Sequence, residues 1–221
     1  MHFLRCVLAE WALVRPRLVR THFGPVLLLL GVALVWLGYH GADPLTVALH
    51  AGALGSVVGA GFAAGSAADR AALPIALGHP TGPFAVATGR WLAAMFPAVG
   101  LVVACSVAVG WRTPAAFAGL VAASAVAGCA LTAVLLAGTG AALTLFIFMA
   151  LAGAVPPEAI VGVADPGALR IAVASALELG PALWRYREVV TGSAGALLHA
   201  AAWAALGVVL ASGVVRRRGA P

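Results

Sequence analysis

Six histidines are the side chains of this sequence that most readily suggest metal binding or proton transfer. They are His2, His22, His40, His50, His79 and His199. No two of them have the HxxxH spacing that places two zinc ligands on one helix face, so we expect no metal site. His40 and His50 flank Asp43 near one end of two expected helices, and ionisable groups at such positions are candidates for an outer-side ligand site. Packing of these histidines at the membrane interface is the competing interpretation.

Nucleophilic chemistry has little support in the sequence. An intramembrane serine protease needs a serine and a histidine on neighbouring helices. Ser193 and His199 instead fall within one expected helix, at a spacing that keeps their side chains apart. Cys6, Cys105 and Cys129 form no CxxC motif, and we interpret them as packing residues. We therefore expect no catalytic residues.

The sequence contains no lysine. A P-loop needs a lysine that reaches the β- and γ-phosphates of a nucleotide, and Schiff-base chemistry needs a lysine amine. The chain itself is therefore expected to be neither an enzyme nor the holder of a cofactor. If ATP drives this protein, ATP and Mg²⁺ must be bound by another chain.

The charged residues fall in clusters that are separated by long neutral stretches. The chain has 13 basic and 7 acidic residues among 221. A transmembrane helix needs roughly 20 mostly apolar residues. Single helices fit between Arg20 and Asp43, Asp43 and Asp69, Arg90 and Arg112, and Glu188 and Arg216, and the stretch from Arg112 to Glu158 has room for two. The sequence thus predicts an all-α polytopic membrane protein with six transmembrane helices.

The composition agrees with this fold class. Hydrophobic residues make up 63% of the chain, charged residues 9%, and the mean hydropathy is +1.06. A soluble domain would carry about 25% charged residues, so no separate soluble domain is expected. The net charge of +6 is assigned to arginines at the lipid surface, where each gains about 1 kcal/mol from anionic headgroups. Membrane lipids are therefore expected as partners, and nucleic acid is not.

We expect one transmembrane domain over residues 1–221, which begins with an amphipathic helix within 1–22. In residues 2–15 the apolar side chains recur at helical spacing, with Glu10 away from that face, and Pro16 is expected to end the helix. Such a helix lies on the membrane surface. Its apolar face is formed by Leu4, Val7, Leu8, Trp11 and Val14.

The remaining elements are expected in chain order. Spans 1 and 2 occupy 23–67, and the glycines of the second, over 45–67, predict that it is buried against other helices. A cytoplasmic loop covers 68–84, and spans 3 to 5 cover 85–155, with Pro97 inside the third and a hinge near 138–140. Residues 156–192 are expected to form short reentrant helices on the outer side. Span 6 and a basic tail fill 193–221.

Arginine placement predicts the orientation. With both termini in the cytoplasm, nine arginines lie inside and four outside, as the positive-inside rule requires. The chain is therefore expected in the inner (plasma) membrane as a multi-pass protein. Because we expect no charge buried within the spans, ion or proton coupling is disfavoured and a hydrophobic substrate is favoured.

The loop between spans 2 and 3 has the most specific pattern. A charged pair opens it, apolar residues follow, a proline turn reverses it, and Gly89-Arg90 heads the next span. Apolar side chains on the cytoplasmic side, rimmed by polar ones, indicate a docking surface. The residues are Asp69, Arg70, Leu73, Ile75, Leu77, His79, Pro80 and Arg90.

This arrangement resembles the permeases of ABC-2 type ABC transporters, which have an acidic-Arg pair after span 2, an apolar helix, a proline turn and a Gly-Lys/Arg at span 3. The resemblance covers nearly the whole chain, through the N-terminal helix, the six spans and the outer segment before span 6. The loop departs from the family pattern at Ala71-Ala72 and Pro74, and its charged pair is about two residues closer to Pro80.

The resemblance implies a subunit that pairs with a second permease subunit, as a homodimer or a heterodimer. A separate ABC ATPase would dock on each subunit through the N-terminal helix and the eight docking residues of the preceding list, and the pair would export a hydrophobic or amphipathic molecule. Two other classes remain open. One is a substrate-capture membrane protein of the vitamin-uptake type, which would copurify with its ligand. The other is a non-transporting immunity or structural protein.

Overall fold

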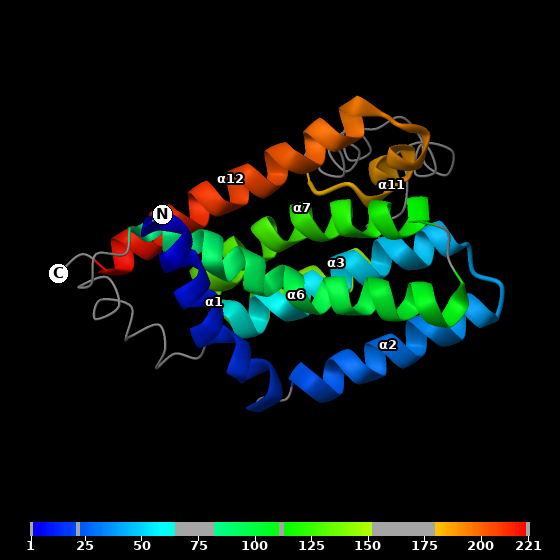
Figure 1. The fold of residues 1–221 in the computed structure, drawn as a ribbon, viewed down its shortest axis with the longest axis horizontal. Coiled ribbons are helices and arrows are strands. Elements are labelled where there is room, and N and C mark those ends of the chain that lie inside the picture. Colours follow the sequence, from blue (N-terminus) through cyan, green and yellow to red (C-terminus); the bar gives the residue numbers. More distant parts are fainter. Residues whose placement is uncertain (1, 21–22, 65–81, 111–112, 152–179, 220–221) are drawn as a thin grey trace, which may run out of the picture.

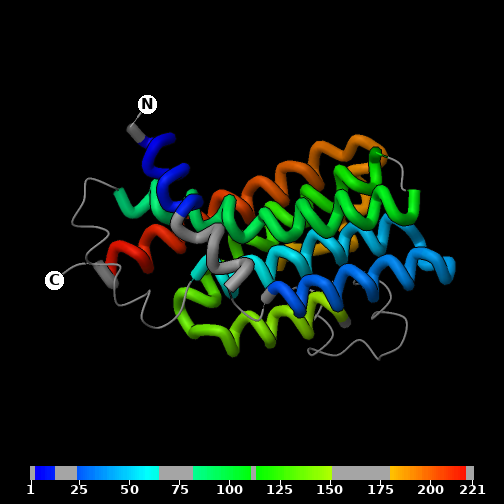
Figure 2. The backbone as a smooth tube through the Cα atoms, turned by 60° about the horizontal axis from the view of Figure 1, so that its bottom comes forward, coloured from blue at the N-terminus to red at the C-terminus, as the bar shows by residue number. Residues whose placement is uncertain are grey.

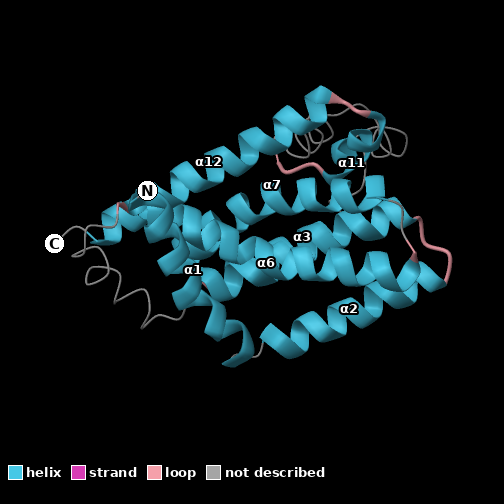
Figure 3. Cartoon of the chain, in the orientation of Figure 1, coloured by secondary structure: helices cyan, strands magenta, loops and turns pink. Residues whose placement is uncertain are grey.

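The computed structural model describes residues 2–20, 23–64, 82–110, 113–151 and 180–219 (Figure 1). Every regular element in these ranges is helical (Figure 3), which confirms the all-α class for this part of the chain. The elements are α1 (His2–Arg20), α2 (Phe23–Tyr39), α3 (Pro44–Ala64), α6 (Pro83–Val109), α7 (Thr113–Ala137), α8 (Thr139–Leu151), α11 (Leu183–Tyr186), the 3₁₀-helix η1 (Arg187–Thr191) and α12 (Ala194–Gly219).

Six of these helices run along one bundle, and successive ones alternate in direction (Figures 1 and 2). The helix α3 lies between α6 and α7, while α2, α8 and α12 lie at the outside of the bundle. The helix α1 crosses the end of the bundle instead of following its long axis (Figure 1). Both described ends of the chain lie at this same end, which we name the α1 end.

Among the described residues, four helices are long and apolar enough to cross a membrane: Pro44–Ala64, Pro83–Val109, Thr113–Ala137 and Ala194–Arg217. The apolar parts of α2 and α8, Gly24–Tyr39 and Thr139–Ala150, are shorter. A helix rises 1.5 Å per residue, so α8 is about 20 Å long against a hydrocarbon core of about 30 Å. The described residues therefore support a multi-pass membrane protein, while the six-span expectation stays a prediction.

Small residues bring the central helix close to its neighbours, as its glycine content predicted. The window of α3 that would span the membrane is 94% buried. A Cβ at Gly119 of α7 would lie 2.6 Å from the carbonyl oxygen of Ala48, so only glycine permits this contact. Ser56 adds a hydrogen bond of 3.0 Å to the carbonyl of Ala123. Close backbone approach and hydrogen bonds between helices are what hold helices together in lipid.

The expected helix boundaries are partly confirmed. Gly138 has a φ of 82°, a left-handed conformation that separates α7 from α8 at the predicted hinge. The helix α6 continues through Pro97. The prediction that Pro16 ends the first helix is wrong, because α1 extends to Arg20. A proline removes one intrahelical hydrogen bond and can bend a helix without ending it.

Two predicted segments fall largely outside the described residues. The loop 68–84 is described only from residue 82, and the outer segment 156–192 only from residue 180. Within the second segment, the structure describes two short helical turns, α11 and η1. They pack against α7 and α12 at the end of the bundle opposite α1 (Figure 1). That this segment is reentrant stays a prediction.

Candidate functional site

A buried ion pair joins the N-terminal helix to the bundle. The Nε atom of Arg90, near the beginning of α6, donates a hydrogen bond of 2.7 Å to Oε1 of Glu10 in α1. Only 5% of the Arg90 side chain and 9% of the Glu10 side chain are exposed. Burial of one of these charges alone would be very costly, so the pair makes the position of α1 depend on α6.

Arg90 also reaches the end of the central helix. Its Nη1 atom donates a hydrogen bond of 3.3 Å to the carbonyl oxygen of Ala64, the last residue of α3. The last carbonyls of a helix have no intrahelical donor and carry partial negative charge, so a guanidinium satisfies both. One side chain therefore connects α1, α3 and α6.

Gly89 explains how α1 approaches closely enough to form the pair. A Cβ at this position would lie 2.8 Å from Cβ of Glu10 and 2.9 Å from the carbonyl oxygen of Val7. Aromatic contacts flank the junction, with ring centroids 6.0 Å apart for Phe3 and Phe84. We name this set of contacts, centred on Glu10, Gly89 and Arg90, the α1 junction.

The α1 junction corrects two sequence-based expectations. Glu10 was expected to point away from the packed face, but it is buried against α6. The expectation that no charge is buried within the spans is wrong at Arg90, which lies inside α6 and is 4% exposed. Within this structure the guanidinium of Arg90 binds Glu10 and the carbonyl of Ala64, and its role in docking stays a prediction. The partner of Arg90 is 80 positions away, and no local pattern identifies it.

The other seven predicted docking residues lie outside the described residues: Asp69, Arg70, Leu73, Ile75, Leu77, His79 and Pro80. The segment that contains them leaves α3 at Ala64 and returns to the described chain at Gly82, so the α1 junction flanks it. The apolar face predicted for α1 is partly buried and partly exposed. Val7 is buried against α6, whereas Leu4 and Leu8 are 61% and 55% exposed.

A second charged cluster lies at the opposite end of the bundle. Asp43 caps the N-terminus of α3 through hydrogen bonds from the amides of Leu45 and Thr46. Its Oδ2 atom also accepts a hydrogen bond of 2.7 Å from Nη2 of Arg187 in η1. Burial tends to raise the pKa of Asp43, but the hydrogen bonds from Thr46 and Arg187 outweigh burial and hold the pKa below its ordinary value of 3.8.

The predicted outer-side histidines do not complete this cluster. His50 contacts the carbonyl oxygen of Thr46 at 2.7 Å through Nδ1, and His40 lies over the ring of Trp36, with centroids 4.3 Å apart. Among the described residues no group of three histidine, cysteine or acidic side chains could hold a metal ion. The partner that sequence reasoning missed here is Arg187, which is 144 positions from Asp43.

Ser193 and His199 have separate roles in the structure. Ser193 caps α12, where its Oγ atom accepts a hydrogen bond of 3.4 Å from the amide of Ala196. Nδ1 of His199 lies 3.2 Å from the hydroxyl of Tyr186. Burial raises the pKa of Tyr186, so this hydroxyl stays neutral over the physiological range.

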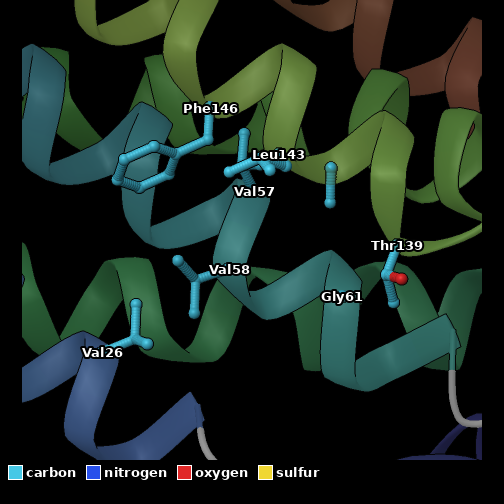
Figure 4. A pocket seen from close by; sticks show the side chains of 8 residues that line it. Val26, Val57, Val58, Gly61, Thr139, Leu143 and Phe146 are labelled. Carbon is cyan, nitrogen blue, oxygen red and sulfur yellow. The ribbon is translucent and has the colours of Figure 1, made fainter.

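An apolar cavity of about 230 Å³ lies between α2, α3 and α8. Val26 comes from α2, and Val57, Val58 and Gly61 come from α3 (Figure 4). Thr139, Ala142, Leu143 and Phe146 line it from α8. None of the described residues that line the cavity is charged, so this lining suits a hydrocarbon group and not an ion.

The chain matches no protein-family model, no curated protein and no solved structure.

Proposed function

We propose that this chain is the membrane-spanning subunit of an ATP-driven transporter of the ABC-2 type. It would work as a dimer with a second permease subunit and bind a separate ABC ATPase. The observation that carries the proposal is the α1 junction. There Arg90 connects the N-terminal helix to the two helix ends, at Ala64 and in α6, that flank the predicted docking loop.

The junction suggests how a partner could move the bundle. A force applied by an ATPase to α1 or to the loop would pass through the buried ion pair into α3 and α6. Because packed helices shift as rigid elements, such a force would change the angles between the helices instead of bending them locally. In this mechanism Glu10 and Arg90 transmit the motion, while the residues of the predicted docking loop contact the ATPase.

The substrate would be hydrophobic or amphipathic. The apolar cavity between α2, α3 and α8 supports this class, because it offers hydrocarbon contacts and no charge. The chain has no lysine, so ATP and Mg²⁺ would be bound by the partner ATPase. Export would follow from rocking of the dimer about a central path.

The proposed location is the inner (plasma) membrane, with both termini in the cytoplasm. Arg216 and Arg217 near the end of α12 lie at the α1 end of the bundle, and the predicted docking loop is attached to the same end (Figure 1). Arginine enrichment at one end supports assigning that end to the cytoplasm.

The coupling proposal can be tested in the docking loop. Substitution of Leu73, Ile75 and Leu77 by aspartate should abolish transport and the stimulation of the partner ATPase, because charge would replace the apolar contact. His40→Ala at the opposite end should leave both activities unchanged. Normal ATPase stimulation by the triple variant would exclude this loop as the docking surface.

One observation favours a substrate-capture protein as the second candidate. A hollow of about 420 Å³ lies beside Asp43, at the end opposite α1, between the α2–α3 turn, the α6–α7 turn and η1. In such a protein the hollow would bind a ligand on the outer side, and binding would not require an ATPase. This candidate predicts that the purified chain carries a small molecule, and that Asp43→Asn reduces the amount retained.

A further inference from the structure

A second hollow of about 400 Å³ lies between α7 and α12, at the α1 end of the bundle. Its walls are apolar, and one basic side chain closes it at the end of α12. The residues that matter here are Thr132 and Leu136 from α7, and Val209, Leu210, Gly213 and Arg217 from α12.

The hollow forms because the backbones of α7 and α12 are in contact at one level along the bundle, whereas no side chain fills the space between them at the next level. A Cβ at Gly128 would lie 3.1 Å from the carbonyl oxygen of Ala204, and Thr132 donates a hydrogen bond of 2.9 Å to the carbonyl of Gly207. Further along α12, a Cβ at Gly213 would meet no atom within 4 Å. The helices are therefore fixed at Gly207, and the space at Gly213 stays open.

The apolar walls are open to the surroundings of the bundle. Leu136, Val209 and Leu210 are 62%, 55% and 48% exposed. In a protein whose helices cross a membrane, such side chains face hydrocarbon. A hollow of this shape therefore suits an acyl chain better than a polar molecule.

The positive charge of Arg217 at the end of the hollow indicates which headgroup would accompany the acyl chain. Three carboxylates occur among the described residues, and each is engaged elsewhere: Glu10 with Arg90, Asp43 with Arg187, and Glu188 with Ser193. The exposed guanidinium of Arg217 thus has no carboxylate partner in the part of the chain that the structure describes. A guanidinium binds phosphate oxygens in pairs, which makes phosphate its natural anionic partner at a lipid surface.

We propose that the α7–α12 hollow binds one anionic phospholipid of the leaflet at the α1 end. Its phosphate lies on Arg217, and one acyl chain lies along Leu136, Val209 and Gly213. This site goes beyond the transport function and does not depend on an ATPase. A general attraction of basic residues to anionic lipid would act equally on the neighbouring Arg216. This side chain precedes Arg217 and is also exposed, but it does not line the hollow.

The test is native mass spectrometry of the full chain in mild detergent, titrated with phosphatidylglycerol or with phosphatidylcholine. We expect one phosphatidylglycerol to bind about fivefold more tightly than phosphatidylcholine, because both lipids carry the phosphate but the choline cation cancels its net charge beside Arg217. Arg217→Gln should remove this preference, whereas Arg216→Gln should keep it. Gly213→Leu should weaken both lipids, and the open space around Gly213 makes this variant compatible with the fold.

Two results would overturn the proposal. Equal losses in Arg216→Gln and Arg217→Gln would show that surface charge alone attracts the lipid. Unchanged phosphatidylglycerol binding in a Gly213→Leu variant with a wild-type melting temperature would show that the lipid does not enter the hollow.

Discussion

Nε of Arg90 lies 2.7 Å from Oε1 of Glu10, and both side chains are almost completely buried. The two residues are 80 positions apart and belong to helices that cross at the α1 end of the bundle. Arg90 also binds the last carbonyl of α3. This relationship makes the N-terminal helix part of the bundle, and the coupling mechanism that we propose depends on it.

Removal of one partner of this pair should destabilise the protein strongly. In Glu10→Gln the guanidinium of Arg90 stays buried without its counter-charge, a change that typically costs about 3–5 kcal/mol. The melting temperature in detergent should fall clearly. In the double variant Glu10→Gln/Arg90→Gln the loss should be smaller than the sum of the single losses.

The exposed pair Asp43–Arg187 is the matched control for this experiment. Its side chains are 47% and 42% exposed, and exposed ion pairs contribute about 0.2–1 kcal/mol. Arg187→Gln should therefore change the melting temperature much less than Glu10→Gln. Equal effects of the two variants would contradict the structural importance of the buried pair.

The approach of α1 to α6 should depend on Gly89. A leucine at this position would collide with Glu10 and Val7, since even its Cβ would lie within 3 Å of both residues. Hydrogen exchange of the α1 amides should become faster in Gly89→Leu. Gly100→Leu in the same helix is the control, because a Cβ there meets nothing within 4 Å. Similar exchange in the two variants would mean that α1 is not held against Gly89.

Gly52→Ala should separate α3 from α7. The added methyl group would collide with the backbone of Gly119, and overpacking of this kind typically costs about 1–3 kcal/mol. Gly140→Ala in α8 has open space and should be neutral or slightly stabilising, because alanine is the better helix former. Thermal unfolding of both variants in detergent measures the difference in stability. A wild-type melting temperature for Gly52→Ala would contradict the close contact between α3 and α7.

Asp43 should stabilise the fold in a pH-dependent manner. Its pKa in the folded protein lies below the ordinary value of 3.8, so its contribution is fully present above 3.8 and is lost as the pH falls through the lower, folded value. The gap in melting temperature between wild type and Asp43→Asn should be constant from neutral pH down to about 5 and should close below 3.8. The gap should also be small, since the side chain is half exposed. A gap that widens at low pH would contradict this assignment.

The sequence predicted most helices well, because hydrophobic runs and turn residues are local signals. The positions of α3, α6 and α12, the hinge at Gly138 and the burial of α3 all follow from such signals. The extent of α1 was underestimated, since Pro16 was assumed to end it. The number of membrane crossings stays a prediction because α2 and α8 are short.

The candidate sites were harder to predict, because they join distant parts of the chain. Arg90 was predicted as a docking residue, but its burial depends on Glu10, whose position in an amphipathic pattern suggested exposure. Asp43 was singled out with two histidines, whereas its actual partner is Arg187. Ion pairs between residues this far apart in sequence leave no periodic pattern, so they become visible only when the helices are placed in space.

The most direct test of the proposed function is purification of the chain from native membranes in mild detergent, followed by mass spectrometry of what remains bound. We predict a P-loop ATPase in stoichiometric amount, retained by wild type and by His40→Ala but lost from the variant in which Leu73, Ile75 and Leu77 are replaced by aspartate. A chain that comes out alone, or with a small molecule and no ATPase, would contradict the transporter proposal.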